Sequence, residues 1–467
     1  MKTAPSATPA TNPVNVCTTV VANHLCVGCG TCAGMCPADC LTIQTNAYGE
    51  YNPCLSEGCT DCGLCLKVCP FYDATINEDT LAQARFGQVP GIRHTSESGY
   101  DLACYAGNVL SESRHWTRSA GGLASWFLAE LLEQKIVDRV ACVVHNPDPD
   151  TLFRFAVLQT PEEVWNAATS CYYPVEMSEV LRTIRRENLR FAVIGLPCFL
   201  KALGKAMAAN SKLADRIVVL AGLVCSHLKS KFFADYLVRL AGADPATVRH
   251  ITFRKKPPGA ALNQYVFACR TRPDDAASER TLTNDAFLWP EQPFKINACD
   301  FCDDVFAECA DVTFMDAWLP QYVTRPGGTN LVMVRSPRAL ALLEQGRREE
   351  ELFLEPLDAP QLVPAQRGNI ARKRKQLAVR LALARKKGLW VPAKRVPPDM
   401  GTGIVQRFEI AAAHRRVAAG RMAFAKQRQA GAGLDVFRHD LRRLTFRDRL
   451  IRRLLSLPSR IRHRLKK

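Results

Sequence analysis

Residues 26–37 read CVGCGTCAGMCP, and residues 59–70 read CTDCGLCLKVCP. Both stretches have the spacing C-x2-C-x2-C-x3-C-P, which is typical of iron–sulfur proteins with two 4Fe–4S clusters. In this arrangement three cysteines of one tight loop face one cluster, and the fourth lies beyond a turn and binds the other cluster. The two stretches therefore predict a pair of clusters with crossed ligation.

The predicted ligands follow from this crossing. One cluster takes Cys26, Cys29, Cys32 and Cys69, and the other takes Cys36, Cys59, Cys62 and Cys65. Zinc also binds C-x2-C pairs, but a zinc site does not explain eight cysteines with a proline after each run. We interpret residues 20–75 as an α+β, ferredoxin-like, two-cluster domain that carries electrons.

Length and composition place this domain within a larger protein. The chain has 467 residues, enough for two or three domains, and no apolar run approaches the roughly 20 residues that a membrane-spanning helix needs. Residues 1–19 are expected to be a disordered leader without the apolar stretch of a secretory signal. Twenty cysteines in such a chain favour metal binding over disulfides, and we expect a cytoplasmic protein.

The pattern after the cysteine runs predicts an α/β domain. Residues 76–97 are expected to form a linker, and residues 98–345 to form a domain with a mostly parallel sheet, split near residue 180. Apolar strands are expected at 102–110, 140–144, 191–194, 217–220, 312–315 and 331–334. Helices are expected at 123–134, 199–207 and 231–240. Residues 346–467 are expected to be a basic helical tail.

Four further cysteines suggest a third cluster. Cys198 and Cys225 each follow a predicted strand in a Gly-x-x-Cys loop, and Cys299 and Cys302 form another C-x2-C pair. The carboxyl edge of a parallel sheet is where ligands bind, so a third 4Fe–4S cluster is predicted there. Alternatively, Cys198 and Cys225 are small buried hydrophobes, or Cys309 replaces Cys302 in the set.

These motifs together resemble the beta-subunit family of coenzyme F-420 hydrogenases and dehydrogenases, over roughly residues 20–340. Beyond the cysteine runs, the resemblance rests on residues 119–122 (SAGG), 195–198 (GLPC), 222–225 (GLVC), 253–255 (FRK), 299–302 (CDFC), 310–311 (AD) and 316–318 (DAW). It implies FAD beside a 4Fe–4S cluster on Cys198, Cys225, Cys299 and Cys302. The sequence departs from the family where Met315 precedes Asp316 and where Ser226 separates Cys225 from His227.

The flavin site implied by this resemblance has no G-x-G-x-x-G motif. The best candidate is the helix start at Ser119, Gly121 and Gly122, whose backbone N–H groups can hold a pyrophosphate. Ser119 could equally be a plain helix cap. Arg254 and Lys255 could bind a flavin phosphate or an anionic substrate, or could belong to a solvated basic turn.

His227 is the candidate general acid for proton transfer, because its ordinary pKa suits that role. A lone histidine is more often structural. The function predicted is that of an oxidoreductase passing electrons between 4Fe–4S clusters and FAD, with a ferredoxin or another redox protein as partner. The alternative is an electron-transfer subunit without a substrate of its own.

The net positive charge of the chain comes from its tail. Residues 367–467 hold 29 Lys and Arg against 5 Asp and Glu, whereas the first 366 residues hold 33 against 40. Basic amphipathic helices at 377–384 and 441–455 could dock on the inner face of an anionic membrane or on an acidic partner. The alternative is a helical extension lying on the protein's own acidic body. A specific nucleic-acid role is not expected.

Overall fold

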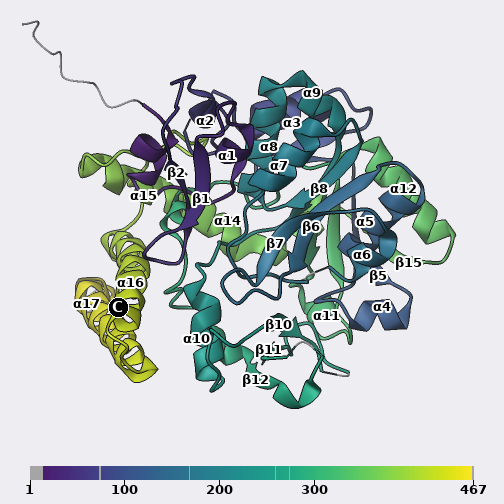
Figure 1. The fold of residues 1–467 in the computed structure, drawn as a ribbon. Helices are drawn as coiled ribbons and strands as arrows, with labels where there is room; N and C mark the ends of the chain where they lie inside the picture. Colours follow the sequence, from purple (N-terminus) through teal and green to yellow (C-terminus); the bar gives the residue numbers. More distant parts are fainter. Residues whose placement is uncertain (1–13, 73–74, 168, 258, 273, 465–467) are drawn as a thin grey trace, which may run out of the picture.

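The computed structural model describes residues 14–464, apart from residues 73–74, 168, 258 and 273 (Figure 1). Most of the predicted disordered leader lies outside the described residues, and the part that is described ends in a short π-helix, Cys17–Val21.

The centre of the molecule is an eight-stranded sheet with the order β15-β5-β14-β13-β9-β8-β6-β7. Its strands are β5 Ala103–Val109, β6 Arg139–His145, β7 Phe153–Leu158, β8 Phe191–Gly195, β9 Ile217–Leu223, β13 Val312–Asp316, β14 Asn330–Val334 and β15 Leu352–Leu357.

This sheet is mixed, and the prediction of a mostly parallel sheet holds only for its centre. The strands β13, β9, β8 and β6 run parallel, whereas β14, β5, β15 and β7 pair antiparallel with their neighbours. A crossover through α8 Pro197–Ala209 and α9 Ser211–Arg216 joins the parallel strands β8 and β9. A short loop joins β6 to β7, and such a loop suits only an antiparallel pair.

Helices cover both faces of the sheet. On one face, α5 Leu123–Glu133, α6 Pro161–Trp165 and α12 Pro337–Arg348 pack their apolar sides on the strands. In α5 the buried residues Leu123, Phe127 and Leu131 recur every four positions, which is the spacing of one helical face. On the other face, α7 Ser178–Arg186 and α8 share a second core with the N-terminal residues.

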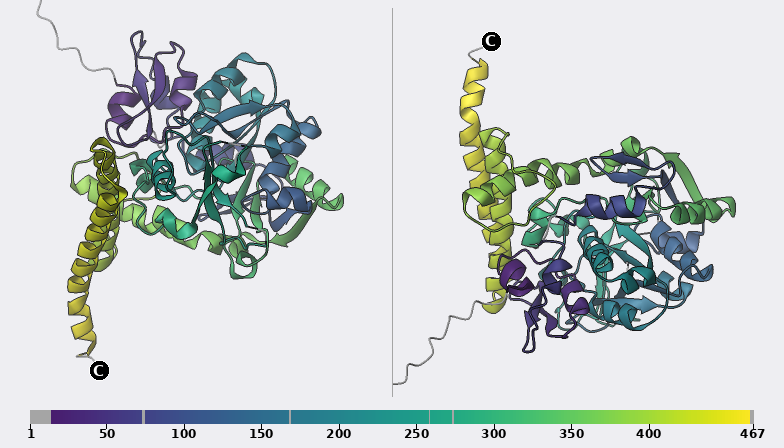
Figure 2. Two further views of the ribbon diagram at one scale, coloured as in Figure 1. Left: turned by 60° about the horizontal axis from the view of Figure 1, so that its bottom comes forward. Right: turned by 90° about the horizontal axis from the view of Figure 1, so that it is seen from above.

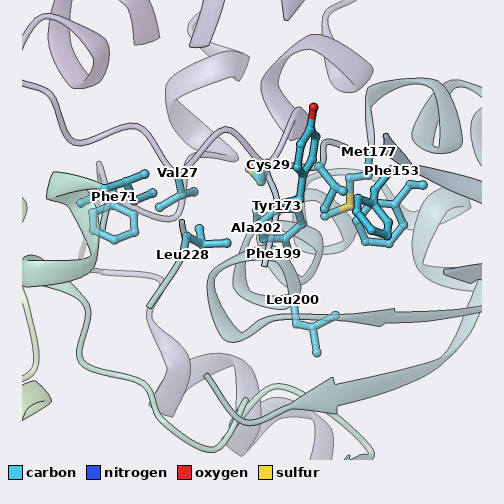
Figure 3. Packing of buried hydrophobic residues seen from close by; sticks show 14 of the residues in the cluster. Val27, Cys29, Phe71, Phe153, Tyr173, Met177, Phe199, Leu200, Ala202 and Leu228 are labelled. Atoms are coloured by element: carbon cyan, nitrogen blue, oxygen red, sulfur yellow. The ribbon is translucent and has the colours of Figure 1, made fainter. Parts of the chain in front are cut away.

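The N-terminal cysteine region packs directly onto this second core. Its elements are α1 Thr31–Met35, β1 Leu41–Thr45, β2 Tyr51–Leu55 and α2 Leu64–Lys67, with β1 and β2 antiparallel. Figure 3 shows Val27, Cys29 and Phe71 of this region in one buried cluster with Phe199 and Leu228 of the α/β domain. The two regions therefore share a hydrophobic core. The expected linker contains α3 Glu78–Phe86 and β3 Arg93–Thr95, and β4 Gly99–Asp101 follows it directly.

A smaller antiparallel sheet lies beside α10 Phe232–Leu240. Its strands are β10 His250–Lys255, β11 Val266–Arg270 and β12 Arg280–Thr283. Phe253 of β10 stacks on Phe233 of α10 with ring centroids 5.9 Å apart. This aromatic contact fixes β10, and with it Arg254, against the main domain.

The chain beyond residue 345 is not one uniform tail. The expected boundary at residue 345 falls inside α12, and β15 then completes the main sheet.

The α-helices not yet described lie on both sides of this boundary. They are α4 Glu112–Trp116, α11 Pro320–Val323, α13 Ala359–Leu362, α14 Arg367–Lys373, α15 Lys375–Lys386, α16 Ile404–Gln429 and α17 Leu434–Arg464. Within the described residues, no helix is both long enough and apolar enough to cross a bilayer.

A group of buried carboxylates joins this C-terminal region to the domain. Glu78 of α3 and the loop residues Asp303, Asp304 and Glu308 are each at most 3% exposed. Burial and the neighbouring carboxylates of Glu308 and Glu78 raise the pKa of Asp304 to about 7. So many buried acids in one place require cations beside them.

The cations come from two distant parts of the chain. Lys201 of α8 lies 2.9 Å from the Glu78 carboxylate. Arg395, which follows α15, lies 2.7 Å from a Glu308 carboxylate oxygen and 2.6 Å from Asp79. Lys394 lies 3.4 Å from Asp303. We call residues 394–395 with their carboxylate partners the C-terminal clamp, because they fasten the C-terminal region to α3 and to the loop 303–308.

Replacing Arg395 with methionine should weaken the fold. The substitution leaves Glu308 and its neighbours buried with too little positive charge, so the free energy of unfolding should fall by about 3 kcal/mol. Urea unfolding followed by circular dichroism measures this loss. The matched control is Arg385→Met, because Arg385 is exposed near the end of α15. Equal unfolding midpoints for the two variants would contradict the clamp.

Candidate functional site

The cysteines of the N-terminal region surround two separate cavities. One cavity is lined by Cys26, Cys29, Cys32 and Cys69, which we call the first cysteine set. The other is lined by Cys36, Cys59, Cys62 and Cys65, which we call the second cysteine set. In each set three cysteines come from one run and the fourth comes from the other run, which is the grouping that the spacing predicts.

The crossing has a local cause in the short helices. Gly30 and Gly63 take positive φ values of 78° and 70° and begin α1 and α2 directly after the second cysteine of each run. Cys32 and Cys65 lie in these helices, whereas Cys36 and Cys69 lie just beyond them. One helical turn thus carries the fourth cysteine away from its own loop and toward the other cavity.

The surroundings of the sulfur atoms suit thiolate ligands. In the first set the backbone N–H of Gly28 donates to Cys26 Sγ at 3.3 Å. Burial raises the pKa of Cys26 well above its ordinary value, so a positive metal centre would be needed to hold this thiolate. In the second set, Cys40 also lines the cavity, with its Sγ atom 3.5 Å from Cys36 Sγ. The sequence spacing gave no reason to expect Cys40 there.

The described residues contain no group of three or more Cys, His, Asp or Glu side chains that converges on a single ion. Four thiolates on one tetrahedral zinc ion would have sulfur atoms about 3.8 Å apart, given Zn–S bonds of about 2.3 Å. In a 4Fe–4S cluster each thiolate binds its own iron, so the sulfur atoms surround the cluster at larger separations.

A third cysteine set gathers at the carboxyl edge of the sheet. It consists of Cys198 at the start of α8, Cys225 after β9, and Cys299 and Cys302 in and just after the 3-10 turn Asn297–Phe301. Burial and the neighbouring thiols of Cys302, Cys225 and Cys299 raise the pKa of Cys198 well above its ordinary value. Cys29 of the first set belongs to the buried cluster against which Cys198 packs, and it contributes to the raised pKa of Cys198, so the two sets lie in the same core.

Two groups donate hydrogen bonds to sulfur atoms of this third set. The backbone N–H of Leu228 donates to Cys299 Sγ at 3.1 Å, and the Lys373 ammonium donates to Cys302 Sγ at 3.3 Å. Lys373 belongs to α14, in the region expected to be a tail, and it also donates to the Asp304 carbonyl at 2.5 Å. Cys309, the alternative to Cys302, is buried. Its pKa is raised by burial and then by the carboxylates of Glu78 and Asp304, so its surroundings are the buried carboxylates.

A large cavity lies beside the third set. This large cavity encloses about 1440 Å³ of space, a figure that includes its open mouth. Ser119, Gly122 and Arg254 line it, together with Leu196, Val224 and Leu228, which flank the third cysteine set. The loop before α5 forms part of its wall.

The predicted flavin residues divide into two groups. Ser119, Gly122 and Arg254 line the large cavity, with Arg254 held 2.5 Å from Asp316. Gly121 instead packs on the sheet, where an added Cβ would lie 2.6 Å from the Gly107 carbonyl. Lys255 lies 2.5 Å from Glu279 and is not among the lining residues.

The sequence analysis missed one wall of the large cavity. Thr169, Ser170, Tyr172 and Tyr173 line it from the segment between α6 and α7. The Ser170 N–H donates to the Ser119 hydroxyl at 3.2 Å and so joins this segment to the loop before α5. No motif marks these residues, and the adjacent tyrosines at 172 and 173 are the one local signal that could have suggested them.

A side cavity of about 790 Å³ opens beside the large one. Both are lined by Leu196, Val224, Leu228, Met315 and Asp316, and the side cavity adds Cys225, Ser226, His227, Lys229, Trp289 and Trp318. His227 Nδ1 lies 2.9 Å from the Ser226 hydroxyl, and Nε2 has no hydrogen-bond partner among the described residues. The side cavity therefore adjoins the large cavity, with which it shares lining residues, and it reaches the third cysteine set at Cys225.

Electrostatics change the expected role of His227. Burial and the cations Lys229 and Lys295 lower the pKa of His227 well below its ordinary value, which favours the neutral imidazole. A general acid must be protonated at neutral pH, so the role predicted for His227 gains no support. Burial beside Lys295 also lowers the pKa of Lys229 to about 7, and its ammonium lies over the rings of Phe233 and Trp289.

Comparison with known proteins identifies the family. The model for the N-terminal part of the coenzyme F-420 hydrogenase/dehydrogenase beta subunit matches residues 104–182, and the model for its C-terminal part matches residues 189–360. Both N-terminal cysteine runs lie outside these matches. No curated protein matches the chain.

A solved structure, an F-420-reducing nickel–iron hydrogenase complex from Methanosarcina barkeri, also contains a similar chain. It is 17% identical, and the match covers 62% of this chain and 95% of that one with a TM-score of 0.47. The two family models together span more than half of the sequence, as the motifs predicted. The chain belongs to the coenzyme F-420 hydrogenase/dehydrogenase beta-subunit family.

Proposed function

We propose that the protein is an iron–sulfur flavoprotein oxidoreductase, in which three 4Fe–4S clusters connect a redox partner with FAD. The observation that carries this proposal is the position of the third cysteine set. It neighbours the first set through Cys29 and Cys198, and it neighbours the large cavity through Leu196, Val224 and Leu228. Such a chain of sites suits electron transfer over short steps.

The order of the sites suggests where electrons enter or leave. Cys62 of the second set is exposed, and Cys59 and Cys65 are half-buried, whereas every cysteine of the first set except Cys26 is buried. The second set is therefore the proposed contact point for a ferredoxin or another redox protein. The first and third sets then lead inward toward the large cavity.

A flavin bound in the large cavity would supply the conversion between single electrons and an electron pair. The protein's own residues would position it. The loop before α5 would face the pyrophosphate with its backbone N–H groups, aided by the helix dipole. Arg254, fixed by Asp316, would add positive charge at the same end.

The side cavity favours an enzyme over a subunit without its own substrate. It adjoins the large cavity, and Trp318, one of its lining residues, is 40% exposed. Lys229 and His227 give this cavity cationic and hydrogen-bonding groups, which suit an anionic or carbonyl-bearing substrate. A transfer subunit would need no such space.

Metal and flavin analysis after anaerobic purification tests the proposal. We expect about twelve irons and about twelve sulfides per chain, together with about one FAD. About eight irons would contradict the third cluster. A protein without flavin, which also binds none when FAD is added, would contradict the oxidoreductase.

Double substitutions test the crossed ligation. Cys32→Ala with Cys69→Ala should remove one cluster and about four irons, because both cysteines belong to the first set. Cys62→Ala with Cys69→Ala should remove two clusters and about eight irons, although both cysteines lie in the same run. The reverse pattern would mean that each run binds its own cluster. Circular dichroism shows whether the variants remain folded.

A bulky side chain in the large cavity should exclude the flavin. Ala124 lines this cavity from the first turn of α5 and is half-buried, so Ala124→Trp adds bulk at the cavity wall. FAD affinity should fall about tenfold or more, with the iron content unchanged. Ala214→Trp is the matched control, because Ala214 is half-buried on α9 and does not line the cavity. Unchanged FAD binding by Ala124→Trp would place the flavin elsewhere.

A further inference from the structure

The last two helices form a hairpin with one attached side and one free side. Phe437 and Leu441 of α17 are buried, and Phe437 packs against Phe424 of α16 and Phe294 of the domain. Farther along, Asp448 of α17 lies 2.6 Å from Arg416 of α16. These contacts define the side of α17 that faces α16, and Figure 2 shows that the end of α17 projects beyond the body of the protein.

The opposite side of α17 carries a line of exposed apolar residues. Phe446, Leu450 and Leu454 are 69%, 50% and 57% exposed. They follow one another at intervals of four, so they lie on one face of the helix. Large apolar side chains thus stand exposed in a row on a projecting helix.

Arginines border this apolar line on both sides. At 100° per residue, Arg443 and Arg447 lie beside the line on one flank, Arg449 and Arg453 lie on the other, and Arg442 precedes Phe446 by four residues in the line itself. All five are exposed. Between residues 441 and 456 the only acidic residue is Asp448, which is buried and paired with Arg416. The free face is therefore purely cationic and apolar.

We propose that this free face of α17 binds the surface of an anionic lipid bilayer. An apolar line flanked by arginines matches an interface in which the apolar side chains enter the acyl boundary and the guanidinium groups meet the lipid phosphates. A second copy of the chain is a poor occupant, because its own arginines would be repelled. Nucleic acid would attract the arginines but leave the apolar line unused.

Sedimentation of the full-length protein with lipid vesicles tests this proposal. Vesicles of phosphatidylcholine mixed equally with phosphatidylglycerol should bind the protein, and vesicles of phosphatidylcholine alone should not. Binding should weaken as salt rises, since the Debye length falls from about 10 Å at 0.1 M to about 3 Å at 1 M. Equal binding to both vesicle types, or to neither, would overturn the proposal.

Substitutions on the free face separate the two kinds of contact. Phe446→Gln, Leu450→Gln and Leu454→Gln combined should lower the vesicle partition coefficient about tenfold or more, and glutamine preserves helix propensity. Arg443→Gln, Arg447→Gln and Arg453→Gln combined should have a comparable effect. The matched control is Phe353→Gln, a 43% exposed phenylalanine on β15.

Full binding by the apolar triple variant would overturn a membrane contact and indicate a purely electrostatic one, as for an acidic protein or nucleic acid. Circular dichroism and the iron content of each variant verify that the fold is intact. The proposal does not depend on the redox function, so a protein that lacks flavin could still bind the vesicles.

Discussion

The structure depends on the neutralisation of the buried carboxylates behind the third cysteine set. Glu78, Asp303, Asp304 and Glu308 come from α3 and from the loop that directly follows Cys302. Buried acids without partners would destabilise this loop, and the cations that balance them come from α8 and from residues 394–395. The same contacts that stabilise the fold thus hold the cysteine loop in place. These ion pairs join α3, α8 and the C-terminal region, and the N-terminal cysteine region joins the same body through the shared hydrophobic core.

This arrangement gives the third cysteine set an unusual environment. Its four cysteines come from two strand ends and one turn, and Lys373 from the C-terminal region places a positive charge 3.3 Å from Cys302 Sγ. A hydrogen bond and a positive charge at a thiolate favour the reduced form of a cluster bound there, because reduction adds negative charge. The C-terminal region, which lies beyond the family match, therefore contributes to the proposed electron path. The clamp would hold the loop after Cys302 in place, and Lys373 would influence the reduction potential of a cluster in the third set.

The sequence predicted the parts of the site that depend on local spacing. The crossed sets follow from the cysteine runs, and the positions of Cys198 and Cys225 follow from apolar strands that end in Gly-x-x-Cys, as β8 and β9 do. Features that depend on tertiary contacts could not be predicted. The antiparallel edges of the sheet, the wall at Tyr172 and Tyr173, and the outward turn of Lys255 to Glu279 have no local signal. The basic tail was predicted from charge alone, which cannot distinguish buried clamp residues from the exposed arginines of α17.

The central claim is that three cysteine sets hold three clusters in sequence toward the large cavity. X-ray diffraction at the iron absorption edge, from crystals of anaerobically prepared protein, tests it most directly, because anomalous scattering locates iron. The account predicts three separate iron centres, one in each cysteine set, with the centre at Cys198, Cys225, Cys299 and Cys302 between the first set and the large cavity. Iron in the first two sets alone, or a single-ion site in the third, would contradict it.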